Sequence, residues 1–98
     1  MAISSSTNFK NLTYLDVSQN DLKASGAQIL AVSQNLYNLQ HLNITHNKIE
    51  ESGFRCLADS ESFPLLNNLV IYSGNHITQD CKKYLHRSKK MNQLNHIS

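Results

Sequence analysis

Histidine and cysteine are the side chains in this sequence with the widest chemical repertoire. The sequence has five histidines and two cysteines. Both residue types bind transition metals, and a cysteine beside a base can act as a nucleophile. A structural zinc site uses close pairs such as C-x-x-C or H-x-x-x-H, and neither pattern occurs. The residues in question are His41, His46, His76, His86, His96, Cys56 and Cys81.

Whether any of these side chains is reactive depends on the elements that position them. His41 and His46 are the nearest pair, but their expected places on a strand and in a turn point them in different directions. Lys82 and Lys83 follow Cys81, and positive charge favours a thiolate, whereas burial of the thiol opposes it. The sequence has no glycine-rich phosphate loop and no serine nucleophile elbow.

A sequence repeat fixes where these side chains fall. The stretch NLTYLDVSQNDL (11–22) aligns with NLQHLNITHNKI (38–49) at an offset of 27 residues, and a third copy follows at LLNNLVIYSGNHI (65–77). Leucine, valine and isoleucine occupy the same positions in each copy. We therefore predict about three structural repeats, at approximately 12–38, 39–65 and 66–93, within a single domain spanning 1–98.

The third copy contains one additional residue. Its offset from the second copy is 27 up to Ile71 and 28 from Asn75 onward. Gly74 is suited to a bulged turn at this point because glycine tolerates a positive φ. At the same offset of 28, MNQLNHIS (91–98) is the lead-in to a fourth copy, of which 94–98 is a partial repeat that begins a strand.

Each repeat contains a strand and a helix. Alternation in YLDVS places Leu15 and Val17 on one sheet face and the intervening residues on the other. Helices are expected near 24–34, 51–59 and 79–89. Thr78 is a predicted N-cap for the last helix, with Asp80 in its first turn. The predicted inward helix positions are Gly26, Ile29, Leu30, Gly53, Cys56, Leu57, Cys81, Tyr84 and Leu85, so both cysteines are expected in the core.

Three asparagines follow the strands at equivalent positions: Asn20, Asn47 and Asn75. We interpret them as a structural asparagine ladder, in which buried amides bond backbone groups of the turns that would otherwise be unpaired. Gly26 and Gly53 interrupt helices at a cost of about 1 kcal/mol each relative to alanine. Close packing of helix against strand is the expected compensation.

The spacing L-x-x-L-x-L-x-x-N-x-L resembles the leucine-rich-repeat signature. The period of 27–28 residues, with SGAQIL and SGFRCL after the asparagine segment, is similar to the ribonuclease-inhibitor-like class of that family. The resemblance implies an α/β solenoid, with parallel strands on a concave face and helices on a convex face. The third copy departs from the pattern at the residue inserted before Asn75 and at Cys81, which replaces the glycine of the earlier copies.

The resemblance implies a protein-binding module that works through the concave face. We expect no catalytic residue, no metal site and no cofactor, so the chain is not expected to be an enzyme. The alternatives left open are a structural fragment of a larger leucine-rich-repeat protein without independent binding, and a repeat domain attached to an enzyme. The predicted partner-binding residues are Tyr14, Asp16, Ser18, His41, Asn43, Thr45, Asn68, Val70 and Tyr72.

Charge is distributed unevenly along the chain. Residues 1–80 contain four Lys/Arg and seven Asp/Glu, whereas residues 81–98 contain five Lys/Arg and no acidic residue. The basic segment 82–90 is expected to be a solvated outer helix face; contact with an acidic partner, nucleic acid or an anionic membrane is the alternative. The net charge of +2 does not favour a nucleic-acid binder, and no apolar stretch is long enough to span a membrane.

Composition also bears on location and assembly. The first ten residues lack the features of a secretory signal, and two cysteines do not form a disulfide framework, so a cytoplasmic location is expected. Leucine-rich-repeat modules also occur in effectors that bacteria deliver into host cells, and the abundance of Asn, Ser and Lys favours such a source and a host-cytosol location. Incomplete repeats at both ends predict a homodimer through the solenoid ends.

Overall fold

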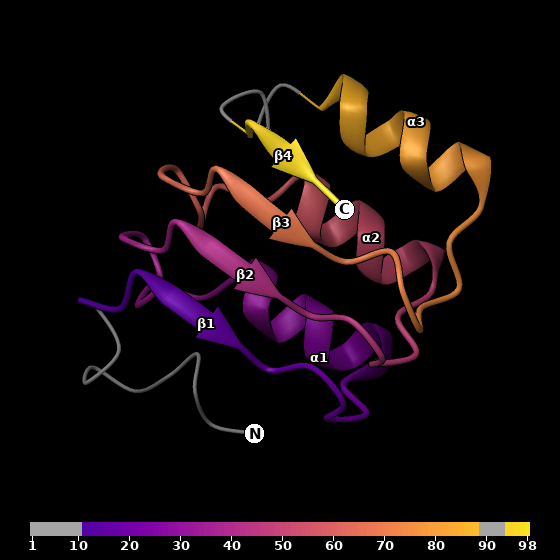
Figure 1. The fold of residues 1–98 in the computed structure, drawn as a ribbon, viewed down its shortest axis with the longest axis horizontal. Helices are drawn as coiled ribbons and strands as arrows, with labels where there is room; N and C mark the ends of the chain where they lie inside the picture. The colour runs from indigo at the N-terminus through magenta and orange to yellow at the C-terminus, as the bar shows by residue number, and fades with distance from the viewer. Residues whose placement is uncertain (1–10, 89–93) are drawn as a thin grey trace.

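The computed structural model describes residues 11–88 and 94–98 as two layers, a sheet and a row of helices. Strands and helices alternate along the chain, and all neighbouring strands pair in parallel in the order β1-β2-β3-β4 (Figure 1). The helices lie on one side of the sheet and leave the other side open. The elements are β1 (Tyr14–Asp16), α1 (Lys23–Ala31), β2 (His41–Asn43), α2 (Glu51–Ala58), β3 (Asn68–Val70), α3 (Gln79–Arg87) and β4 (His96–Ile97).

The repeat offsets reappear as the register of the sheet. Leu15 pairs with Leu42, Leu42 with Leu69, and Leu69 with Ile97, so the offsets are 27, 27 and 28 residues. The strands are short, and their inward leucines are almost completely buried in the core beneath the sheet. This pairing confirms the prediction of parallel strands and of a strand in the fourth, partial copy.

The three helices begin and end differently. Only α3 among them has a side-chain N-cap, because the Thr78 hydroxyl oxygen accepts a hydrogen bond from the Cys81 N–H at 3.2 Å. This bond confirms Thr78 as the predicted cap, and Asp80 lies in the first turn. Each helix ends one to three residues before its predicted end, with Ala31, Ala58 and Arg87 as the last helical residues.

The glycines pack differently from the sequence-based prediction. A Cβ atom on Gly53 would lie 2.8 Å from Ile49 Cγ2 and 3.1 Å from Ala27 Cβ. Gly53 therefore lets α2 approach α1, and the prediction of close helix–strand packing is wrong at this position. Gly74 has φ = +70°, which confirms the prediction for the inserted residue.

The inward faces of the helices are also rotated relative to the prediction. Ile29 was expected in the core, but 46% of its surface is exposed. Ala27 and Phe54 are fully buried instead, although neither was predicted. Ile29 borders a hollow at the start of α1, which is the first helix among the described residues.

Polar contacts on the convex side join α2 to α3. The Tyr84 hydroxyl donates to the Asp59 carboxylate, with distances of 2.8 and 2.7 Å to its two oxygens. That bond, with a smaller effect of burial, raises the pKa of Tyr84. The guanidinium of Arg55 lies 5.1 Å from the centre of the Tyr84 ring and pairs with Glu51 at 2.9 Å. Tyr84 and Arg55 therefore both stabilise the orientation of α3 relative to α2.

Candidate functional site

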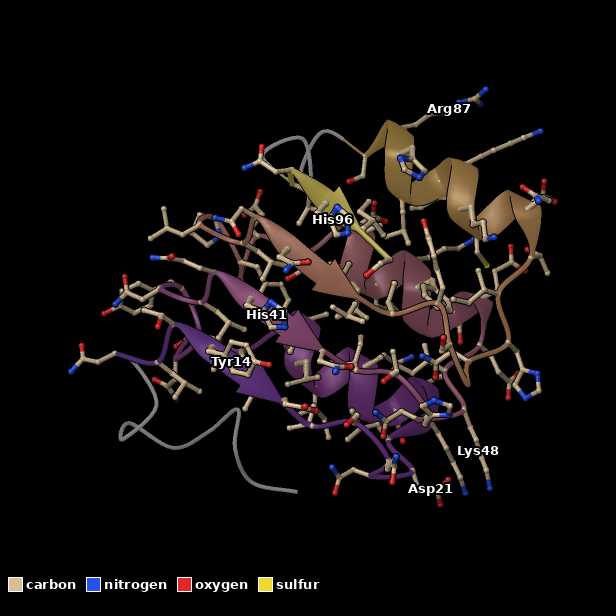
Figure 2. All side chains as sticks on the ribbon, in the orientation of Figure 1. Tyr14, Asp21, His41, Lys48, Arg87 and His96 are labelled. Carbon is tan, nitrogen blue, oxygen red and sulfur yellow. The ribbon has the colours of Figure 1, made fainter. Side chains whose placement is uncertain are left out.

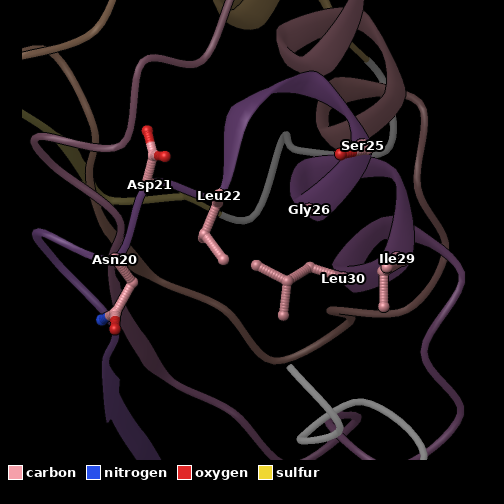
Figure 3. A pocket seen from close by; sticks show the side chains of 7 residues that line it. All are labelled: Asn20, Asp21, Leu22, Ser25, Gly26, Ile29 and Leu30. Carbon is pink, nitrogen blue, oxygen red and sulfur yellow. The ribbon is translucent and has the colours of Figure 1, made fainter.

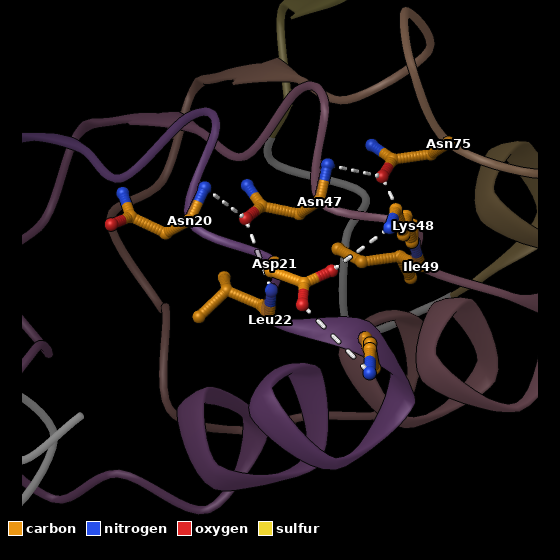
Figure 4. Close-up of polar contacts among 8 residues, drawn as sticks. Asn20, Asp21, Leu22, Asn47, Lys48, Ile49 and Asn75 are labelled. Atoms are coloured by element: carbon orange, nitrogen blue, oxygen red, sulfur yellow. Dashed lines mark hydrogen bonds and ion pairs between the residues drawn. The ribbon is translucent and has the colours of Figure 1, made fainter.

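The asparagine ladder holds the turns that follow the strands (Figure 4). The Asn47 Oδ1 atom accepts hydrogen bonds from the N–H groups of Asn20 (2.8 Å) and Leu22 (3.2 Å) in the preceding repeat. Its Nδ2 donates to three backbone carbonyls, and the residue is completely buried. Every polar atom of this amide is therefore used within the fold, which leaves none for a ligand.

The other two asparagines show that the ladder has a direction. Asn75 Oδ1 accepts from the N–H groups of Asn47 and Ile49, each at 3.0 Å, so each amide serves the turn of the repeat before it. Asn20 was expected to be buried like Asn47, but it is exposed. Its Nδ2 donates only to Val17 and Ser18, within its own turn. The expectation of a buried amide is wrong for Asn20.

The sheet face turned away from the helices, called the concave face below, carries an aromatic and polar row (Figure 2). The strand register places Tyr14 beside His41, His41 beside Asn68, and Asn68 beside His96. The Tyr14 and His41 rings are stacked, with centroids 4.2 Å apart and an interplanar angle of 4°. Asn68 Nδ2 lies 2.9 Å from His41 Nδ1, and the buried Asn68 Oδ1 has no hydrogen-bond partner among the described residues.

His96 is part of this row, although it was not among the predicted binding residues. The signal that identifies it is the offset of 28 from Asn68, which the sequence already contains. His96 is exposed and lies at the last strand, opposite Asn68. The row consequently presents two imidazoles with Asn68 between them.

A second group of predicted residues surrounds Asp16 at the carboxyl end of β1. Asp16 Oδ1 accepts a hydrogen bond from the Ser18 N–H at 2.9 Å. Hydrogen bonds from the Ser18 side chain and backbone, followed by the nearby His41, lower the pKa of Asp16. Asn43 Oδ1 accepts from both the N–H and the hydroxyl of Thr45, at 3.0 and 2.8 Å. Thr45 is only 8% exposed, so it offers little surface for its predicted contact with a partner.

Tyr72 does not belong to the concave face. Its hydroxyl lies 3.4 Å from His86 Nε2, and the Lys82 ammonium lies 5.0 Å from its ring centre. Both contacts are with α3, in the helix layer, and burial raises the pKa of Tyr72. The prediction that Tyr72 lies on the same exposed sheet face as Tyr14 and His41 is therefore wrong. Val70 remains on β3, half-buried and in register with Asn43.

The remaining residues with chemical potential lie apart from this face. In 11–88 and 94–98, no group of three or more His, Cys, Asp or Glu side chains is arranged to hold a metal ion. Cys81 is buried and Cys56 half-buried, and both are free thiols. Lys83 and Arg87 are exposed on α3, while Lys89 and Lys90 of the basic segment lie outside the described residues. No helix in the described part of the chain is long and apolar enough to cross a membrane.

Two hollows of the molecule lie outside the concave face. One, of about 180 Å³, is at the start of α1 and is lined by residues between Asn20 and Leu30 (Figure 3). The other, of about 570 Å³, lies along the carboxyl ends of α1 and α2, between Gln28 and Ser62. The concave face itself offers hydrogen-bonding groups and a flat ring pair on an open sheet, an arrangement that suits contact with a surface.

Comparison with known proteins identifies the repeats. The family model described as Leucine Rich repeat matches residues 10–31 and 37–58, which correspond to the first and second repeats of the fold. No curated protein and no solved structure gives a significant match. The matched repeats, the parallel sheet and the alternating helices agree with one another. The chain therefore contains leucine-rich repeats, and its fold is an α/β solenoid of such repeats.

Proposed function

We propose that the protein binds a partner protein through its concave face, with the Tyr14–His41 pair at the centre of the contact. Leucine-rich repeats generally mediate protein–protein interaction, and this pair is the observation that supports the location. The side chain of Tyr14 is 58% exposed while its ring is held against His41 at 4.2 Å. A tyrosine already fixed in one orientation loses little conformational entropy when a partner covers it, and tyrosine is enriched among binding hot spots.

The size of the face restricts the kind of partner. A stable interface buries about 800 Å² on each side. The strands are only two or three residues long, so a partner must cover most of the face and contact Asp16, His41 and Asn68 together. This requirement favours a folded surface or a broad loop over a small molecule, which needs an enclosed pocket.

The ribonuclease-inhibitor-like class is supported by the helices. α1 and α3 have nine residues and α2 has eight, so each repeat contains a true helix on the convex side. A bacterial effector acting in a host cytosol is supported by composition alone. Effector and non-effector roles share the concave face as the binding surface, so the experiment below applies to both.

The test is capture of proteins from host-cell lysate by the wild-type chain and by matched variants. Tyr14→Ala and His41→Ala remove the ring pair. Tyr37→Ala is the control because Tyr37 is also exposed, at 46%, but lies in the loop before β2 and outside the concave row. We expect a partner retained by wild type and Tyr37→Ala, with affinity reduced at least about 30-fold by Tyr14→Ala, as for a hot spot of about 2 kcal/mol.

Equal binding by all four proteins, or loss of binding with Tyr37→Ala alone, would place the contact elsewhere. Failure of the wild-type chain to retain any partner supports the alternative of a fragment without independent binding. A screen for hydrolase activity on the purified protein separates both outcomes from an enzymatic role. The homodimer through the solenoid ends stays a prediction.

A further inference from the structure

The imidazole of His41 is held between two neighbours in the concave row. Its ring stacks on Tyr14 with centroids 4.2 Å apart, and its Nδ1 atom lies 2.9 Å from Asn68 Nδ2. Both contacts join strands that pair in register, β1 with β2 and β2 with β3. Figure 2 shows His41 between Tyr14 and His96 on the open side of the sheet. The sheet therefore fixes the position of this ring, whereas the charge of a histidine depends on pH.

The contact with Asn68 requires one form of the neutral imidazole. The Nδ2 group of an asparagine amide only donates hydrogen bonds, so His41 Nδ1 must be the acceptor. The proton of the neutral ring then lies on Nε2. When the ring gains a second proton, Nδ1 also becomes a donor, and two donors face each other at 2.9 Å. The hydrogen bond does not persist in that form.

Inversion of the Asn68 amide resolves this conflict without moving either strand. An asparagine amide carries a donor and an acceptor of nearly equal size, so exchanging Nδ2 and Oδ1 alters its hydrogen bonding and little else. The inverted amide places Oδ1 as an acceptor opposite the protonated Nδ1 of His41. A hydrogen bond from a charged donor is stronger than the neutral bond that it replaces.

No hydrogen bond within the described part of the chain holds Asn68 Oδ1 in its present place. This oxygen is buried and has no hydrogen-bond partner among residues 11–88 and 94–98. Inversion therefore exchanges an unpaired acceptor for an unpaired donor at the same buried position. An unpaired buried donor and an unpaired buried acceptor cost similar free energies, so the charge of His41 decides between the two orientations.

The surroundings of His41 permit the charged form of its ring. His41 is half-buried, so the imidazolium keeps contact with water. Asp16 on β1 interacts electrostatically with His41, and attraction between the carboxylate and the imidazolium favours the charged pair. Tyr14 contributes an uncharged ring and Asn68 an uncharged amide. His96 on β4 lies one strand further away, opposite Asn68, and is the other group of the row that gains positive charge over the same pH range.

We propose that His41 and Asn68 form a proton-operated switch on the concave face, in which protonation of His41 inverts the Asn68 amide. The switch is a property of the free chain. Its effect on binding rests on the proposed function, because a partner on the concave face would meet a neutral imidazole at high pH and a cation at low pH.

The test is nuclear magnetic resonance of the free, isotope-labelled full chain from about pH 5 to 7.5, within the range in which histidine changes charge. At the upper end we expect His41 Nδ1 to carry no proton, and the Asn68 amide protons to show nuclear Overhauser contacts with the Hε1 proton of the His41 ring. These contacts should disappear as pH falls, with the same midpoint as the protonation of His41.

Two histidine variants localise the effect. His41→Phe keeps a ring against Tyr14 and removes the titrating nitrogens, so the Asn68 amide signals should become independent of pH. His96→Phe is the matched control, because His96 lies opposite Asn68 on its other side, and it should retain the wild-type response.

Three results would overturn the proposal. The first is a neutral His41 with its proton on Nδ1, and the second is persistence of the Asn68 amide contacts after His41 is protonated. The third is an Asn68 response that is lost in His96→Phe and retained in His41→Phe. None of these measurements needs a partner, so a chain that binds nothing through the concave face leaves the outcome unchanged.

Discussion

Replacing Asn47 with alanine removes five hydrogen bonds from a completely buried site. The losses are not equivalent. The carbonyls that Asn47 Nδ2 bonds each keep a second donor, but the N–H groups of Asn20 and Leu22 lose the acceptor that holds them. The retained bonds are Asn20 Nδ2 to Val17 (2.8 Å), Asn75 Nδ2 to Ile44 (3.0 Å) and Gln19 N–H to Thr45 (3.1 Å).

The magnitude follows from these two donors. An unsatisfied buried polar group costs about 1–3 kcal/mol, so two of them cost roughly 2–6 kcal/mol. A water molecule entering the vacated space can satisfy one donor, so we expect the free energy of unfolding to fall by about 3 kcal/mol. For a domain of this size that corresponds to a decrease in Tm of about 12–24 °C.

Asn20→Ala is the matched control, because Asn20 has the same position in its repeat. Its amide bonds Val17 and Ser18 only, Val17 retains Asn47, and the residue is exposed. We expect a loss below about 1 kcal/mol. Urea unfolding followed by circular dichroism measures both variants, with an unchanged m-value required for the comparison. Similar losses for Asn20→Ala and Asn47→Ala would refute the directional ladder.

Three further predictions concern local packing, capping and titration. Gly53→Ala should destabilise by about 1–2 kcal/mol in urea unfolding, because a Cβ 2.8 Å from Ile49 Cγ2 outweighs the gain in helix propensity. Thr78→Ala should cost about 1 kcal/mol by the same measurement, since α3 loses its only side-chain cap. Carbon NMR titration should show a lowered pKa for Asp16, which Ser18→Ala raises toward its ordinary value. Because the folded-state pKa is the lower one, the stabilising effect of Asp16 is present above its unfolded pKa and disappears as pH falls through the folded value.

The sequence predicted most of what depends on a complete repeat. The offsets of 27 and 28 residues reappear as the strand register, and Gly74 adopts the positive φ expected of the inserted residue. The positive φ follows from the glycine itself, and the register follows from the pairing of each strand with the equivalent strand of the next repeat. Parallel pairing of Asn68 with His96 was implied by the same arithmetic, although His96 was not recognised as a concave residue.

The errors occur where a residue lacks one of its neighbours or leaves the strand. Ile29 and Cys56 were both assigned to the core from their place in the repeat. The helix of Cys56, α2, packs against α1, whereas α1 is the first helix in the described part of the chain, and Ile29 is exposed. Thr45 and Tyr72 follow the last residues of β2 and β3, where alternation of side chains no longer applies. Thr45 therefore turns inward to Asn43, and Tyr72 turns to α3. Sequence periodicity carries no information about such departures.

The direction of the asparagine ladder has a consequence for synthesis on the ribosome. The turn at Asn20 receives its acceptor from Asn47, and the turn at Asn47 receives its own from Asn75. A nascent chain grows from the amino terminus, so each turn emerges 27 or 28 residues before the amide that completes it. The turns at Asn20 and Asn47 can therefore form these bonds only after the following repeat has been synthesised.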